Sequence, residues 1–158
     1  MRGLDPNGGL RSLVVSGPPS AAWQISYEGR GFERFFLGLP RYEQVVLDAA
    51  IKHVLAKEGM NVLTTEWGKP LGQGLAEFRV RRSLEAIFRE AGVPVPADVA
   101  GADRQVLLRV FCTFHGARVV LLLGGYDKGR DPSEKRQQRE IKRARKVKKQ
   151  WEVSRKKS

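Results

Sequence analysis

The chain has 158 residues, 41% of them hydrophobic, which is enough to bury the core of one domain. Its longest apolar run, residues 119–123, is far shorter than the ~20 residues of a transmembrane helix, so we expect no membrane-spanning segment. The single cysteine, Cys112, excludes an internal disulfide and fits a reducing compartment, so we expect a cytoplasmic protein. Metal-ligand and nucleotide-binding motifs are missing, so we expect no metal and no cofactor.

The net charge of +12 is concentrated at one end of the chain. Residues 128–158 hold 14 of the 29 Lys and Arg residues but only 4 of the 17 Asp and Glu residues. A charge block of this kind attracts a polyanion, and nucleic acid is the obvious class of partner.

The first third of the chain predicts a leader, a strand and two helices. Residues 1–22 contain breaker clusters without periodicity, so they are expected to be a poorly ordered leader. Residues 23–27 alternate between apolar and polar side chains, as a short strand does. Residues 32–39 and 41–57 have helical spacing, the first ended by Pro40 and the second by Gly59, and we expect them to form an antiparallel pair.

The middle of the chain predicts a strand with two chemically different faces. Residues 68–74 are expected to be a turn-rich connection. In the strand that follows, residues 75–81, Ala76, Phe78 and Val80 share one face, while the other carries Glu77, Arg79 and Arg81. Residues 83–91 predict a short helix capped by Ser83, within an insert spanning 83–105.

The last third predicts two more strands and a basic helix. Residues 106–114 form a strand with Arg109 on its polar face, and residues 115–116 are expected to turn the chain into a central strand, 118–123, ended by Gly124-Gly125. Asp131 is expected to cap a helix that runs to about Lys149 and docks by a thin apolar stripe. That stripe consists of Ile141, Ala144, Val147 and Trp151, and residues 151–158 are expected to fray as a basic tail.

If the two arginine-bearing strands pair, one sheet face carries guanidinium groups beside the basic helix. Such a face suits a phosphate backbone, and guanidinium groups also stabilise the charge of a phosphoryl transition state. Spacing alone leaves open an ordinary solvated face. The side chains expected to bind RNA are Arg81, Arg130, Lys135, Arg139, Lys142, Arg143 and Lys146.

Five short segments together resemble the RelE/ParE superfamily of toxins from bacterial type II toxin–antitoxin modules, most closely its HigB-like, phage-derived branch. They are residues 35–40 (FFLGLP), 74–79 (GLAEFR), 108–111 (LRVF), 119–128 (VVLLLGGYDK) and 132–144, where Pro132 precedes REIKRA. The likeness covers residues 23–150. It implies an α+β domain in which a small antiparallel sheet packs on an N-terminal helical pair, with a basic C-terminal helix.

The resemblance also implies an activity and partners. Many members cleave messenger RNA in the ribosomal A site without metal, through attack of the 2′-hydroxyl on the adjacent phosphate. Arg79, Arg109 and Lys128 match basic positions of the family, and Tyr126 replaces a usual phenylalanine, so these four are the expected catalytic residues. The expected partners are messenger RNA, ribosomal RNA and a cognate antitoxin, often a small helix-turn-helix protein. The insert at 83–105 is longer than the family's usual turn, and no residue stands out as a general base.

Two other functions remain open at this point. The same fold supports a ParE-like inhibitor of DNA gyrase, which acts through protein contact. The basic helix alone would also suffice for a non-catalytic nucleic-acid-binding module, because phosphate contacts give affinity without chemistry.

Overall fold

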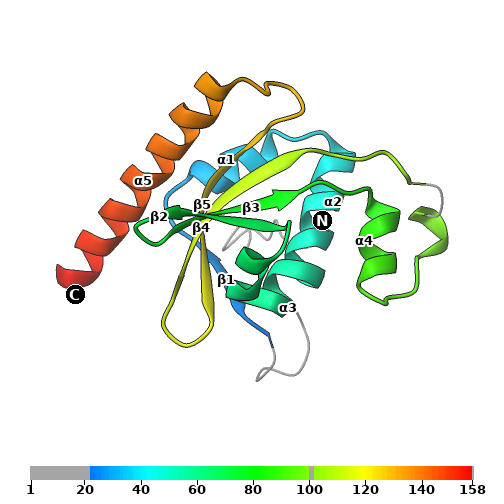
Figure 1. Ribbon diagram of the computed structural model, residues 1–158, viewed down its shortest axis with the longest axis horizontal. Coiled ribbons are helices and arrows are strands. Elements are labelled where there is room, and N and C mark those ends of the chain that lie inside the picture. The colour runs from blue at the N-terminus through cyan, green and yellow to red at the C-terminus, as the bar shows by residue number, and fades with distance from the viewer. Residues whose placement is uncertain (1–21, 100–101, 158) are drawn as a thin grey trace.

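Five strands form one sheet in the order β1-β5-β4-β3-β2, and helices cover both of its faces. The computed structural model describes residues 22–99 and 102–157. Figure 1 shows the C-terminal helix α5 along one side of the sheet and the N-terminal helices on the other. The α+β class and the C-terminal helix are thus confirmed. The expected leader at 1–22 lies almost entirely outside the described residues.

The strands are β1 (Gln24–Tyr27), β2 (Gly68–Gly72), β3 (Leu75–Val80), β4 (Leu108–His115) and β5 (Val119–Asp127). The α-helices are α1 (Gly31–Leu37), α2 (Arg41–Ala50), α3 (Ala56–Glu58), α4 (Leu84–Glu90) and α5 (Glu134–Lys157). A π-helical turn, η3 (Ile51–Leu55), joins α2 to α3, and 3₁₀ segments follow as η4 (Gly59–Thr64) and η5 (Ala97–Val99). The two predicted N-terminal helices are therefore present, and Gly59 lies just past the end of the second one, as expected.

The sheet is mixed, whereas an antiparallel one was expected. β1 runs parallel to β5, with Gln24 opposite Val119 and Tyr27 opposite Leu122, and the other neighbouring strands are antiparallel. A tight hairpin imposes antiparallel pairing, but the first and last strands are far apart in the chain and are free to run in the same direction.

The two sheet faces bury two separate hydrophobic cores. The larger core joins the face that carries Ala76, Phe78 and Val80 to the N-terminal helices, as the alternation of β3 predicted. The smaller core lies between the opposite face and α5, where Ala144 meets Phe111 and Leu123. Ile141, Val147 and Trp151 pack at its margin, so the predicted docking stripe of the last helix is confirmed.

Two connections expected from the glycine pattern differ in the structure. Residues 68–72 form an edge strand, and the turn is confined to Gly72, Gln73 and Gly74, all with positive φ. β4 and β5 are joined by three residues, 116–118, rather than by a two-residue turn. Gly116 and Arg118 in that turn have positive φ, which an arginine adopts only at some cost.

The ends of the last helix also differ from expectation. Ser133 is the capping residue, because its hydroxyl accepts a hydrogen bond from the Arg136 backbone N–H at 3.2 Å. Asp131 instead accepts hydrogen bonds from the backbone and hydroxyl of Ser133. The helix continues to Lys157, so the predicted basic tail is helical over its described part.

Candidate nucleic-acid interface

Three side chains form a row across the sheet face that α5 covers. Arg79 of β3 lies directly opposite Arg109 of β4, and Arg109 lies opposite Tyr126 of β5. The predicted pairing of the two arginine strands is therefore present. Side chains opposite each other on neighbouring strands have Cβ atoms about 5 Å apart, so the two guanidinium groups repel unless an anion lies near them.

Tyr126 reaches this face because of a β-bulge. Between Phe111 and Cys112 the register shifts, so that Cys112 pairs with Leu122 while Phe111 pairs with Gly124. The extra residue reverses the alternation of β5, and Tyr126 consequently points to the same side as Arg109. Gly124-Gly125, expected to end the strand, thus lie within it.

A buried carboxylate, Glu77, holds the arginines together. Its Oε1 accepts a hydrogen bond from Arg79 Nε at 2.8 Å and lies 3.5 Å from Arg109 Nε. Its side chain has 0% exposure. Desolvation of one buried carboxylate is offset here by two guanidinium groups. The sequence did place Glu77 on the arginine face, but Glu77 was not among the expected site residues.

The first turns of α5 cover this cluster. Gln137 Nε2 donates a hydrogen bond to Glu77 Oε2 at 3.1 Å, and the Arg136 guanidinium lies 5.4 Å from the centre of the Tyr126 ring. The Arg109 side chain is only 5% exposed, and the buried Tyr126 hydroxyl has no hydrogen-bond partner among the residues that the structure describes. Burial also raises the pKa of Tyr126. Of the four expected catalytic residues, Arg109 and Tyr126 therefore lie beneath the helix, out of reach of a substrate.

Arg79 and Lys128 are the expected catalytic residues that a ligand can reach. The Arg79 side chain is 24% exposed, and Lys128, just beyond β5, is half-buried. Partial burial and the nearby Arg109 guanidinium lower the pKa of Lys128. Arg79 and Arg81 act in the same direction, whereas Glu77 opposes them. Lys128 therefore loses its proton more readily than an ordinary lysine.

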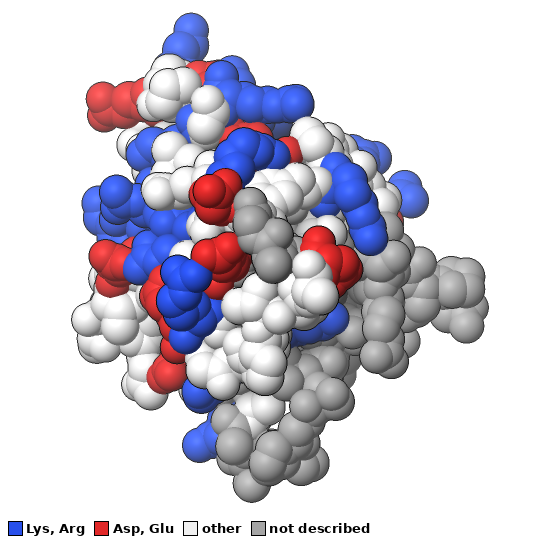
Figure 2. All heavy atoms as spheres, turned by 90° about the vertical axis from the view of Figure 1, so that its right-hand side faces the viewer, with Lys and Arg blue, Asp and Glu red and all other residues white. Residues whose placement is uncertain are grey.

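All seven side chains expected to bind RNA are exposed: Arg81, Arg130, Lys135, Arg139, Lys142, Arg143 and Lys146. Five of them lie on α5, where 12 of 24 residues are Lys or Arg and three are Glu. The face on the side of α4 is different, because Figure 2 shows basic and acidic side chains interspersed there. The α5 side is the surface suited to a phosphate backbone.

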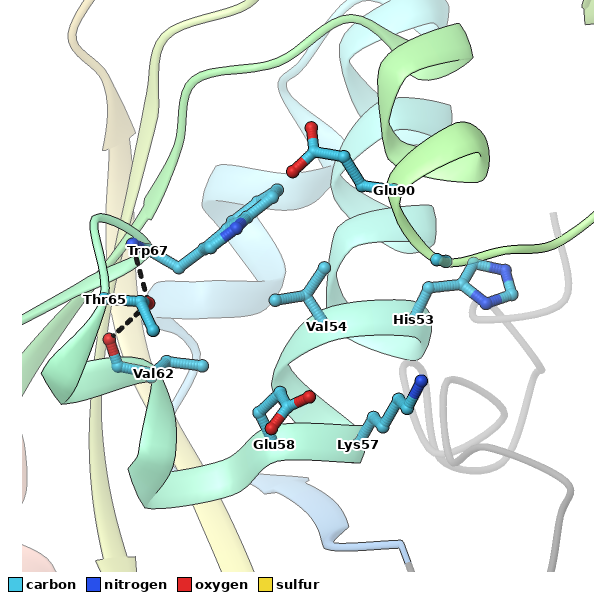
Figure 3. Close-up of a pocket in the computed structure, with 9 residues that line it drawn as sticks. His53, Val54, Lys57, Glu58, Val62, Thr65, Trp67 and Glu90 are labelled. Atoms are coloured by element: carbon cyan, nitrogen blue, oxygen red, sulfur yellow. Dashed lines mark hydrogen bonds between the residues drawn. The ribbon is translucent and has the colours of Figure 1, made fainter.

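A separate pocket lies on the helical side of the sheet, away from the arginine row. It has a volume of about 290 Å³, and Figure 3 shows His53, Trp67 and Glu90 among its lining residues. The Trp67 ring stacks on Phe78 at 5.9 Å, and the Arg82 guanidinium lies 4.9 Å from the centre of the Trp67 ring. These contacts give Trp67 a packing role in this pocket.

Among the residues that the structure describes, no three His, Cys, Asp or Glu side chains gather as a metal site requires. No helix in the described part of the chain is long and apolar enough to cross a membrane. Comparison of the chain with protein-family models, curated proteins and solved structures finds no match.

Proposed function

We propose that this chain is the toxin of a toxin–antitoxin module, a metal-independent endoribonuclease that cuts messenger RNA on the ribosome and so inhibits translation. The resemblance of its sequence motifs to RelE/ParE toxins supports this activity. One structural feature supports it further: burial and the charges of the arginines on the sheet lower the pKa of Lys128, which precedes the basic helix α5 in the chain.

The proposed chemistry divides the roles between these residues. Lys128 in its neutral form accepts the proton of a ribose 2′-hydroxyl, whose oxygen then bonds to the adjacent phosphorus. The bond from phosphorus to the 5′-oxygen breaks, and that oxygen takes up a proton as it leaves. Arg79 stabilises the charge that develops on the phosphate. Glu77 holds Arg79 in place by a hydrogen bond, and Glu77 also lies beside the buried Arg109.

A variant of Lys128 tests the proton-transfer role in a cell-free translation reaction with purified protein. The wild type should halt protein synthesis and leave transcripts cut within coding regions, with cleavage rising between pH 7 and pH 9 as more Lys128 becomes neutral. Lys128→Arg keeps the positive charge but cannot lose its proton, so cleavage should fall by about 10²-fold or more. Lys57→Arg, at an exposed lysine on α3, is the matched control and should cut like the wild type.

The burial of Arg109 and Tyr126 favours a second candidate, a non-catalytic module that blocks translation by binding RNA. Under that function Lys128→Arg inhibits translation as well as the wild type, and transcripts stay intact. Inhibition of gyrase supercoiling with intact transcripts would instead support the ParE-like alternative. Undisturbed protein synthesis in the presence of the wild type would contradict both RNA-directed functions.

A further inference from the structure

A groove between α1 and α5 has no role in the chemistry proposed above. It has a volume of about 730 Å³, and its floor is formed by Leu123, Gly124 and Gly125 of β5. β1 pairs with β5 only as far as Leu122, so α1 lies beside the part of β5 that follows. Figure 1 shows α1 and α5 on either side of this end of the sheet.

The floor of the groove is open at Gly124. A Cβ built on Gly124 would meet no atom within 4 Å, so the glycine leaves free space above the strand. The half-buried Phe35 ring lines one wall, and Val147 lines the other. A planar group could therefore enter and lie against an aromatic side chain.

The rim of the groove is positively charged. Arg34 contributes from α1, and Arg143 and Lys146 contribute from α5. The one carboxylate among the lining residues, Glu140, is buried and already accepts hydrogen bonds from Arg136 at 2.7 Å and Arg143 at 3.5 Å. Because its charge is paired with two guanidinium groups, the Glu140 carboxylate does not repel an incoming anion strongly.

The groove is continuous with the arginine cluster. Arg136 lines the groove and its guanidinium also lies over the Tyr126 ring, the cross-strand neighbour of Arg109. An extended anionic ligand lying along α5 would thus run toward the end of the sheet where Lys128 follows β5. An acidic peptide satisfies the rim charges, but the flat floor beside Phe35 favours a nucleobase.

We propose that this groove binds single-stranded RNA, with a base against Phe35 at the open floor beside Gly124 and phosphates on Arg34, Arg143 and Lys146. The inference rests on the proposed function in taking RNA as the ligand. It adds a binding path separate from the reacting groups. A single strand is required, because paired bases could not reach the groove floor.

Binding of a short fluorescein-labelled oligouridylate, measured by fluorescence anisotropy over a range of KCl concentrations, tests the proposal without requiring cleavage. Gly124→Val fills the floor but removes no charge, and it should weaken binding about fivefold or more, the lower limit for loss of a stacked base. Arg34→Ala with Arg143→Ala should reduce the slope of log affinity against log salt by about 1.4, as two lost phosphate contacts would.

The matched control is Arg41→Ala with Lys57→Ala, which removes two exposed charges on the helical layer and should leave tight binding in place. Should Gly124→Val unfold the protein, Gly124→Ala places one carbon in the same free space and should still weaken binding measurably. If both glycine variants fold and bind RNA with wild-type affinity, the groove is not the RNA-binding site, whether or not the protein cleaves RNA.

Two further outcomes separate this inference from the proposed function. If RNA binding depends on the groove but the protein cleaves no RNA, the result supports the groove as an RNA-binding site and contradicts the proposed nuclease activity. Binding of a labelled oligoglutamate that depends on Gly124, with no groove-dependent binding of oligouridylate, would overturn the RNA groove in favour of an acidic protein segment.

Discussion

Glu77 organises the candidate site at the scale of single residues. Its carboxylate has no exposed surface, yet it accepts hydrogen bonds from Arg79 and from the side-chain amide of Gln137, and Arg109 lies 3.5 Å away as a counter-charge. Loss of one partner of a buried ion pair leaves the other charge without compensation, which costs more than the pair contributes. Glu77 therefore couples the arginine row to the position of α5.

Glu77→Gln should consequently destabilise the fold, although it preserves the shape of the side chain. We expect a loss of roughly 3–5 kcal/mol in the free energy of unfolding, measured by urea denaturation, because Arg109 stays buried and unpaired. Glu58→Gln changes an exposed carboxylate and should alter it by no more than about 0.5 kcal/mol. Equal stability of Glu77→Gln and wild type would show that Arg109 has another counter-charge.

The two histidines predict how stability depends on pH. Burial lowers the pKa of His53 and of His115, with Lys52 and Arg155 acting in the same direction. The unfolded chain therefore binds more protons than the folded protein below the ordinary histidine value of about 6.5. Stability should fall as the pH drops from 7 to 5, and the combined variant His53→Gln with His115→Gln should lose less over that interval in thermal melts.

At the scale of elements, the two glycines that follow the bulge of β5, Gly124 and Gly125, have opposite surroundings. A Cβ built on Gly125 would lie 2.6 Å from the Phe35 ring and 2.7 Å from the Arg109 carbonyl oxygen, whereas Gly124 faces open space. Of these two positions, only 125 needs glycine for α1 to approach the strand closely.

Gly125→Ala should destabilise the protein by about 1–3 kcal/mol, as insertion of a methyl group into a packed interior does. Gly124→Ala is the matched control with the same chemical change and should stay within about 0.5 kcal/mol of the wild type. Chemical denaturation of both variants measures the difference. Equal losses would contradict the close packing of Phe35 against Gly125.

The basic helix α5 is held by contacts along its whole length. Arg145 donates hydrogen bonds to the carbonyl oxygens of Leu71 and Gly72 on β2. Near the C-terminal end of the helix, the centres of the Trp151 and His115 rings are 4.7 Å apart. The Arg155 guanidinium lies 4.6 Å from the centre of the Trp151 ring. These contacts explain why the helix continues past Trp151, where fraying was expected: tertiary packing stabilises helices more than propensity does.

At the scale of the whole molecule, one tyrosine attaches the insert to the helical layer. Tyr42 on α2 donates a hydrogen bond from its hydroxyl to the Arg104 carbonyl at 2.6 Å and accepts one from the Leu84 backbone at 3.3 Å. The Arg104 guanidinium also lies over its ring at 4.4 Å.

Tyr42→Phe keeps the ring and removes these hydrogen bonds. Amides of α4 should then exchange with solvent about 5–10-fold faster, as expected for loss of roughly 1 kcal/mol of local stability. Amides of β4 and β5, which lie at the centre of the sheet, are the internal control and should exchange as before. Uniform acceleration throughout the sheet would instead indicate that the insert opens only with global unfolding.

Much of the architecture could be predicted from local patterns. Alternation in β3 correctly separated Phe78 from Arg79, and helical spacing correctly identified α2 and the docking edge of α5. The errors concern elements whose limits depend on partners. Residues 68–72 are a strand because β3 offers an edge to pair with, and Gly124-Gly125 stay in β5 because β4 continues opposite them.

The sequence by itself determined the class of the fold, the face on which the arginines lie and the concentration of charge on the last helix. These features follow from periodicity and composition, which are local properties of the chain. Only the tertiary structure decided that Glu77 pairs with both arginines and that α5 covers Arg109 and Tyr126 while leaving Lys128 within reach. The physical reason is that burial, and the pKa and ion pairing that depend on it, are set by segments distant in the chain.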